Sequence, residues 1–288
     1  MLHDAWADRA KSLLYFGEPV KPRGFPTLEE LGRNLFVANT QYNLLDVPAR
    51  KLNFRFAVAE WLWMSFGRSD VATLALFNSK MSHYSDDGVF LTGAYGPHIG
   101  AQRPHVLETL RADPVSRQAV IEIPRPKGPT KDEPCTLSLQ FFLRQDLLHL
   151  LVTMRSSDVW LGIPYDVFSF TMLQNEMAGQ LGVRRGWLSL NMGSSHLYQR
   201  DVPDVNAVLA QLDVWNTIRT PDLPGRAPGW LEHVLMHPAS PLPDIAFDEG
   251  GPWLPYARVL GSKTSADARL ILLESHVSDV RLSQPPRA

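Results

Sequence analysis

The sequence contains little of what an exported or membrane-bound protein needs. A single cysteine among 288 residues excludes an intramolecular disulfide and any zinc site built on several cysteines, and we expect no metal. The most apolar run, residues 146–154, is too short to span a membrane, and residues 1–11 lack the apolar segment of a secretion signal. We therefore expect a soluble cytoplasmic protein with no membrane partner.

A strong net charge, internal repeats and flexible linkers are missing as well. The 28 Lys and Arg residues nearly balance the 30 Asp and Glu residues, so no overall field attracts a nucleic acid polymer. No Gly/Ser-rich linker and no internal repeat divides the chain, and 44% of the residues are hydrophobic, enough for a large core. These features predict one domain over residues 1–288.

Helical and strand-like patterns follow one another without a regular alternation. The apolar spacing predicts helices over residues 54–66, 70–80, 104–113, 167–181 and 230–236. It predicts strands over residues 119–123, 136–143, 147–154 and 268–273, with a hairpin turn at residues 144–146. Residues 1–50 are mixed and contain loop-forming Pro and Gly. Helices interspersed with neighbouring strands are typical of an α+β fold.

Cys135 follows Pro134 at the junction of a predicted loop and a predicted strand. A lone cysteine is most often a small, buried, apolar residue. The alternative is a nucleophile, which needs a lowered thiol pKa or a soft electrophile nearby. The cysteine by itself leaves both interpretations open.

Two further groups of residues suit a nucleotide. Arg155 and Ser156 end a predicted strand and offer charge and a hydroxyl to a phosphate monoester. The alternative for this segment is a solvated strand end in which Arg155 pairs with Asp158. His196 and Tyr198 share one face of an extended segment and can reach the same sugar hydroxyl.

Glu60 lies in the middle of a predicted helix, between Ala59 and Trp61. A carboxylate flanked by aromatic residues is either a solvated acid on the helix surface or an acid in a pocket, where burial raises its pKa. Each of these signals is weak when it is taken singly, so the function has to be inferred from the order of these segments along the chain.

Together these segments resemble the thymidylate synthase family, which includes pyrimidine hydroxymethylases. The matching segments, in the order of the family, are residues 59–67, 93–96, 113–117, 134–135, 139–142, 155–166 and 193–198. The resemblance covers about residues 50–200 and leaves residues 200–288 unaligned. It implies a mixed sheet flanked by helices and a homodimer that forms through the sheet.

The resemblance implies a catalytic set of Cys135, Glu60, Tyr95 and Asp166. Cys135 would add to C6 of a pyrimidine nucleotide and make C5 nucleophilic toward the co-substrate 5,10-methylenetetrahydrofolate. Cysteine suits this step because its thiolate pushes charge into the ring and can leave again. Glu60 and Tyr95 would move protons around the base and its bound water. Asp158 would contact the folate, and Met81 would form part of the pocket wall.

The resemblance also implies a substrate-binding set of Arg23, Arg117, Arg155, Ser156, Asp166, His196 and Tyr198. Arg155 and Ser156 would hold the 5′-phosphate, joined by Arg117 from the partner subunit of the homodimer. Arg23 is a further candidate for the phosphate, although its Pro-Arg-Gly context matches the family only in part. His196 and Tyr198 would bind the sugar 3′-hydroxyl.

The departures from the family concern the base and the pocket wall. Asp166 stands where the family has an asparagine that recognises uracil. An amide donates and accepts, whereas an ionised aspartate only accepts, so it fits the amino group of cytosine and leaves O4 of uracil without a donor. Met81 replaces a wall tryptophan, Thr136 a histidine and Gln118 a second arginine. The tail, residues 282–288, does not resemble the closing tail of the family.

The sequence therefore predicts a pyrimidine nucleotide hydroxymethyltransferase or methyltransferase, and we expect a dCMP 5-hydroxymethylase. A flexible wall residue and a tail that does not resemble the closing tail of the family favour water over hydride as the group that ends the reaction, and we expect Glu60 to activate this water as a general base. Four alternatives stay open: a dCMP C5-methyltransferase, a CMP 5-hydroxymethylase of nucleoside-antibiotic biosynthesis, a dUMP thymidylate synthase and an inactive nucleotide-binding regulator. A bacterial or phage-infected cell, with DNA modification as one setting, is the expected context.

Overall fold

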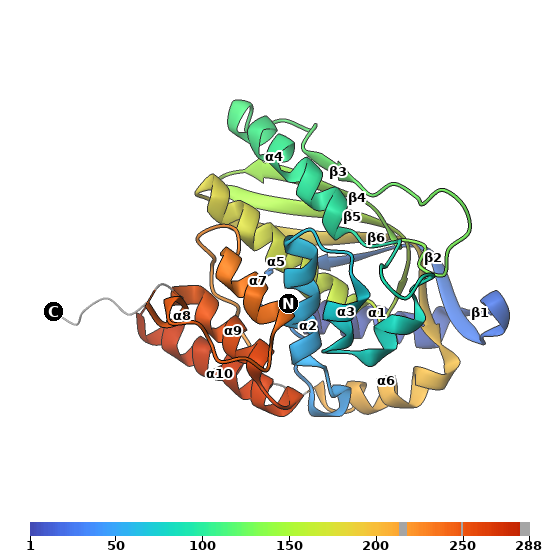
Figure 1. Cartoon of the computed structure of the whole chain (residues 1–288). Coiled ribbons are helices and arrows are strands. Elements are labelled where there is room, and N and C mark those ends of the chain that lie inside the picture. The colour runs from blue at the N-terminus through green and yellow to red at the C-terminus, as the bar shows by residue number, and fades with distance from the viewer. Residues whose placement is uncertain (213–217, 249, 283–288) are drawn as a thin grey trace.

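The computed structural model describes residues 1–212, 218–248 and 250–282, and these residues form one mixed sheet of six strands (Figure 1). The order is β1-β2-β6-β5-β4-β3, and β5 and β6 are the one parallel pair among the described strands. The strands are β1 (Glu18–Val20), β2 (Thr27–Val37), β3 (Val120–Glu122), β4 (Thr136–Arg144), β5 (Leu147–Asp158) and β6 (Arg184–Tyr198). The two central strands, β5 and β6, place the predicted phosphate and sugar segments side by side.

Helices pack on the sheet and on one another (Figure 1). They are α1 (Leu2–Phe16), α2 (Phe54–Ser65), α3 (Val71–Ala75), α4 (Gly96–Ala112), α5 (Ile163–Leu181), α6 (Val202–Leu209), α7 (Gly229–Met236), α8 (Ile245–Asp248), α9 (Leu254–Gly261) and α10 (Ser265–Leu282). Helix α5 packs on β5 and β6, and α2 packs on α5. The core between these layers consists of apolar side chains. Those of the sheet that face α5 are fully buried, as at Leu150, Val152 and Leu190.

Helix α5 is the crossover that makes β5 and β6 parallel. It begins after Gly162 with Pro164 in its first turn, where the missing N–H costs no hydrogen bond. It ends at Gly182, whose φ of 68° is a left-handed conformation that glycine adopts without strain. This crossover positions the first turn of α5, with Asp166, beside the end of β5.

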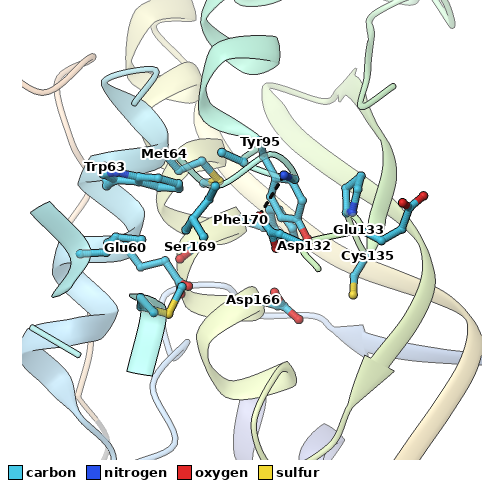
Figure 2. Close-up of a pocket in the computed structure, with 16 residues that line it drawn as sticks. Glu60, Trp63, Met64, Tyr95, Asp132, Glu133, Cys135, Asp166, Ser169 and Phe170 are labelled. Atoms are coloured by element: carbon cyan, nitrogen blue, oxygen red, sulfur yellow. Dashed lines mark hydrogen bonds between the residues drawn. The ribbon is translucent and has the colours of Figure 1, made fainter. Parts of the chain in front are cut away.

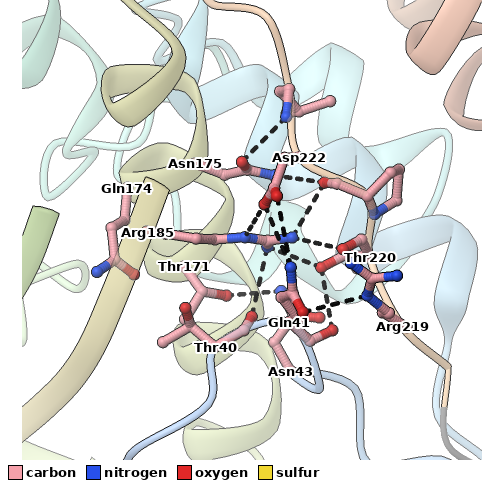
Figure 3. A network of polar contacts seen from close by, with 12 residues as sticks. Thr40, Gln41, Asn43, Thr171, Gln174, Asn175, Arg185, Arg219, Thr220 and Asp222 are labelled. Carbon is pink, nitrogen blue, oxygen red and sulfur yellow. Dashed lines mark hydrogen bonds and ion pairs between the residues drawn. The ribbon is translucent and has the colours of Figure 1, made fainter. Parts of the chain in front are cut away.

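The C-terminal part of the described chain packs on α2. Helices α7, α9 and α10 all contact α2, and Trp253 stacks on Trp61 with ring centroids 6.2 Å apart. The preceding segment is fixed by Arg185 of β6, whose side chain is 1% exposed and binds Thr220, Pro221 and Asp222 (Figure 3). The predicted single domain over residues 1–288 stays a prediction.

Most of the predicted elements between residues 54 and 236 are confirmed. The structure has α2 for the predicted helix 54–66, the β4–β5 hairpin, and α7 for residues 230–236. Helix α5 begins four residues earlier than predicted, and α4 begins at Gly96 rather than at Pro104, which lies inside that helix. The predicted helix 70–80 is divided into α3 and a short 3-10 helix, Ser79–His83.

The predicted strand over residues 268–273 is wrong. These residues lie inside α10, and the buried positions Ala268 and Leu272 are four apart, which is the spacing of one helix face, whereas Leu270 is exposed. The mixed pattern of residues 1–50 concealed α1 and the long strand β2. Of the tail, residues 282–288, positions 283–288 lie outside the described residues. No described helix has the length and apolar character that a membrane crossing requires.

Candidate active site

A cavity of about 160 Å³ lies between α2, the first turns of α5, the segment Gly93–Tyr95 and the segment that leads into β4 (Figure 2). Five of the residues predicted from the sequence line it: Glu60, Met81, Tyr95, Cys135 and Asp166. The other predicted site residues do not line this cavity: Arg23, Arg117, Arg155, Ser156, Asp158, His196 and Tyr198. The structure thus brings the predicted catalytic residues together, although they come from four separate parts of the chain.

Cys135 lies immediately before β4 and is held by Arg155 from the neighbouring strand β5. The Arg155 guanidinium donates to the carbonyl oxygens of Pro134 at 3.0 Å and Glu133 at 2.9 Å, and its Nη2 lies 3.6 Å from the Cys135 Sγ. Ser156 Oγ lies 3.8 Å from the same sulfur. Burial raises the pKa of the Cys135 thiol, and the Arg155 charge offsets this effect only in part.

Two carboxyl groups, Glu60 of α2 and Asp166 of α5, face the cavity from opposite helices (Figure 2). Burial, together with the smaller effect of the nearby charge of Asp166, raises the pKa of Glu60 to about 8. Burial also raises the pKa of Asp166 to about 6, although Ser157 Oγ donates to its Oδ2 at 3.4 Å. With a pKa of about 8, which results mainly from burial, the Glu60 carboxyl holds a proton near neutral pH.

Tyr95 connects the segment before α4 to the residue that follows the cysteine. Its hydroxyl accepts a hydrogen bond from the Thr136 backbone N–H at 3.3 Å, and its ring stacks on Phe170 of α5. Burial raises the pKa of the Tyr95 phenol, which therefore keeps its proton. The phenol is a hydrogen-bond donor available to a ligand in the cavity.

His196 and Tyr198 lie at the end of β6, outside the cavity lining. Their rings are 5.5 Å apart in an edge-to-face arrangement, and His196 is paired in register with Asp158 of β5. Burial lowers the pKa of His196. Tyr198 also contacts the ring of Phe25 at 6.0 Å, so the exposed turn Pro22–Gly24, which carries Arg23, is close to this strand end.

Two residues predicted to bind the folate and the phosphate, Asp158 and Arg117, lie outside the cavity. The Asp158 Oδ1 accepts from the backbone N–H groups of Trp160 at 2.7 Å and Leu161 at 3.1 Å, so this carboxylate shapes the turn that leads to α5. Its Oδ2 is buried without a hydrogen-bond partner among the described residues. Arg117 is exposed on the turn before β3 and is not part of the cavity of its own chain.

Sequence reasoning missed three polar residues of the cavity wall, Asp132, Glu133 and Ser169. Asp132 lines the cavity three residues before the cysteine, in a segment predicted to be a surface loop. Ser169 lies on α5 three residues after Asp166, and its buried hydroxyl has no hydrogen-bond partner among the described residues. The i, i+3 spacing on one helix face is a signal that identifies Ser169 from the sequence. No sequence pattern identifies Asp132.

Comparison with known proteins places the chain beside one protein family and its relatives. A family model described as thymidylate synthase matches residues 14–214, a range that includes every predicted site residue. A protein of Bacillus phage SP01 described as a deoxyuridylate hydroxymethyltransferase is 33% identical over 217 residues, which are 68% of this chain and 57% of that protein. This chain therefore spans less than two thirds of the length of that relative.

Proposed function

This chain belongs to the thymidylate synthase family, and from that premise we propose that it transfers a one-carbon unit from 5,10-methylenetetrahydrofolate to C5 of a cytidine monophosphate. The preferred substrate is dCMP, and the product is the 5-hydroxymethyl nucleotide. The observation that carries this proposal is the position of the Asp166 carboxyl in the same cavity as the Cys135 thiol.

In this reaction Cys135 adds to C6 of the base and leaves again once C5 has been modified. The neutral Tyr95 phenol and the Glu60 carboxyl exchange protons with the base, since both face the cavity and Glu60 has a pKa near the working range of an acid or base. The apolar part of the wall, with Trp63 and Met81, suits the planar ring of the folate co-substrate.

The Asp166 carboxyl and a cytosine ring form a matched pair when they share one proton. The cytosine amino group donates to one carboxyl oxygen, and the shared proton lies between the other oxygen and the ring nitrogen N3. Because burial raises the pKa of Asp166 to about 6, its carboxyl takes up this proton more readily than an exposed aspartate does. Uracil presents O4 in place of the amino group, and O4 is a much weaker base than N3 of cytosine, so it holds the shared proton poorly.

Product analysis tests this proposal. The chain is incubated with CMP, dCMP or dUMP and methylenetetrahydrofolate, and the nucleotide product is identified by its mass. We expect 5-hydroxymethyl-dCMP as the main product, with tetrahydrofolate rather than dihydrofolate released. A methylated nucleotide formed together with dihydrofolate, or nucleotide binding without any turnover, contradicts the proposal.

A second candidate is hydroxymethylation of dUMP. The name of the phage relative favours it, since that protein is described as acting on deoxyuridylate. A protonated Asp166 has one donor and one acceptor and so can pair with O4 and N3–H of uracil. The same incubations distinguish the two candidates by the ratio of product from dCMP to product from dUMP.

The phosphate and sugar contacts follow from the ends of β5 and β6. Arg155 and Ser156 lie beside Cys135 and bind the 5′-phosphate, with Arg23 as a further ligand from the nearby turn. His196 and Tyr198 bind the 3′-hydroxyl. Asp158 is left with one buried, unpaired oxygen for the folate ring.

A homodimer completes this site. An aromatic row crosses the sheet on the face opposite α5, with Phe36 of β2, Trp187 of β6, His149 of β5 and Phe142 of β4 in adjacent positions. Phe36 is 50% exposed, and burying such a row against a second copy is favourable. In the dimer, Arg117 of one subunit reaches the phosphate bound by its partner.

A further inference from the structure

Asp132 is a carboxylate of the cavity wall that the proposed chemistry does not use. Its Oδ2 accepts from the Gly93 backbone N–H at 2.9 Å, and no hydrogen bond among the described residues uses its Oδ1 (Figure 2). A Cβ on Gly93 would collide with the Asp132 carbonyl oxygen, so only glycine permits this close approach. One carboxyl oxygen is therefore fixed by the backbone, and the other is free for a ligand or a water in the cavity.

Two loops are joined on either side of this carboxylate. Asp86 accepts hydrogen bonds from the Thr130 hydroxyl and from the Lys131 backbone N–H at 3.0 Å. The Lys131 ammonium donates to the carbonyl oxygen of Ser85 at 3.3 Å. These contacts fasten the segment before Cys135 to the loop that precedes Gly93, so Asp132 keeps a constant position relative to the nucleophile.

Three other carboxyl residues line the cavity and are less suited to removing a proton from water, and one of them, Glu133, is already paired with Arg125. Asp166 faces the base in the proposed reaction, and the pKa of Glu60, raised to about 8, leaves it protonated near neutral pH. Burial and the charge of Asp86 raise the pKa of Asp132, and the Gly93 N–H opposes this rise only in part. A carboxylate whose pKa is raised and whose second oxygen takes part in no hydrogen bond among the described residues suits a general base.

We propose that Asp132 is the general base that activates the water which ends the hydroxymethyl transfer, an inference that rests on the function proposed above. After folate leaves, an exocyclic methylene remains on C5 and Cys135 remains bonded to C6. The water oxygen bonds to the methylene carbon and gives one proton to the Asp132 carboxylate. The π electron pair moves into the ring, C5=C6 re-forms, and Cys135 departs as a thiolate with the electrons of the C6–S bond.

The test compares wild type with Asp132→Asn, using whichever pyrimidine monophosphate the wild type converts. An asparagine oxygen still accepts from the Gly93 N–H, so the loop geometry is preserved while the base is removed. In a single turnover we expect release of tritium from C5 at the wild-type rate, because that step precedes attack by water. Hydroxymethyl product should form about 100-fold more slowly. An added thiol should trap the accumulated methylene intermediate as a thioether.

Asp86→Asn is the matched control, because it weakens the contacts between the two loops without changing a residue of the cavity wall. We expect this variant to form product at close to the wild-type rate. Equally slow product formation in both variants would show that Asp132 only holds the loop in place. Hydroxymethyl product formed by Asp132→Asn at the wild-type rate, or a higher KM for folate as its sole defect, would overturn the role of Asp132 alone. Absence of hydroxymethyl product from the wild type would overturn the proposed function, and this role with it.

Discussion

The Arg155 guanidinium lies 3.6 Å from the Cys135 sulfur and at the same time binds the two backbone carbonyls that precede the cysteine. One side chain therefore fixes the position of the nucleophile and supplies the positive charge closest to it. Burial still dominates, since the pKa of the thiol is raised despite this neighbour.

Removing this charge should make the cysteine less reactive. Arg155→Ala raises the thiol pKa further, so alkylation of Cys135 by iodoacetamide near neutral pH should slow by about twofold to fivefold, the size of an exposed charge interaction of up to about 1 kcal/mol. Arg125→Ala is the control, because this arginine pairs with Glu133 in the same segment without contacting the sulfur. Equal alkylation rates in wild type and Arg155→Ala would contradict the electrostatic role.

Cys135→Ser should abolish turnover and leave nucleotide binding intact, because serine fills the same space but is a far weaker nucleophile. Mixing these subunits with Arg117→Ala subunits should restore part of the activity, since one hybrid site then has both residues. Activity assays on the mixture, with sedimentation to establish the dimer, check this prediction. A strictly monomeric protein at micromolar concentration would rule out the shared site.

Asp166→Asn should change the preferred base. An amide cannot share the extra proton with N3 of cytosine, but it can donate to O4 and accept from N3–H of uracil. A mismatched buried polar pair costs about 1–3 kcal/mol, so the ratio of kcat/KM for dCMP to that for dUMP should fall by roughly 10- to 100-fold. Initial rates with the two nucleotides measure this ratio, and a ratio equal to that of the wild type counts against Asp166 as the base-recognising residue.

The same residue predicts a pH dependence. Below about pH 6 the Asp166 carboxyl holds a proton and pairs with either base, whereas above it the carboxyl ionises. The cytosine complex keeps the shared proton to higher pH than the uracil complex, because N3 is the stronger base. The kcat/KM for dUMP relative to dCMP should therefore fall as pH rises above 6, by up to about tenfold per unit. In Asp166→Asn this relative value should not change with pH, which makes that variant the control.

The polar network around Arg185 predicts a stability effect away from the cavity (Figure 3). The Arg185 side chain is 1% exposed and pairs with Asp222 at 3.0 Å. Because Asp222 is half exposed, the main effect of Arg185→Ala is to leave the backbone carbonyls of Thr40 and Thr220 without their donor, and it should lower the free energy of unfolding by about 1–3 kcal/mol. Urea denaturation of this variant and of Arg184→Ala, an exposed neighbour expected to change little, measures the difference.

Local sequence patterns determined a large part of this molecule. Apolar spacing alone located α2, the β4–β5 hairpin and most of α5, because one buried face imposes its period on the sequence. The ordered motifs, taken as a resemblance, identified Cys135, Glu60, Tyr95 and Asp166, and the structure gathers all four around one cavity.

Only the tertiary structure decided the rest, because it depends on contacts between distant residues. The apolar pattern of residues 268–273 is compatible with a strand. These residues form part of helix α10, one face of which packs on α2. The contact of Gly93 with Asp132 joins two loops that are 39 residues apart, and no local period encodes such a pairing. The raised pKa values of Glu60 and Asp166 likewise arise from burial and from nearby charges, Asp166 beside Glu60 and Asp158 beside Asp166, which only the folded chain brings together.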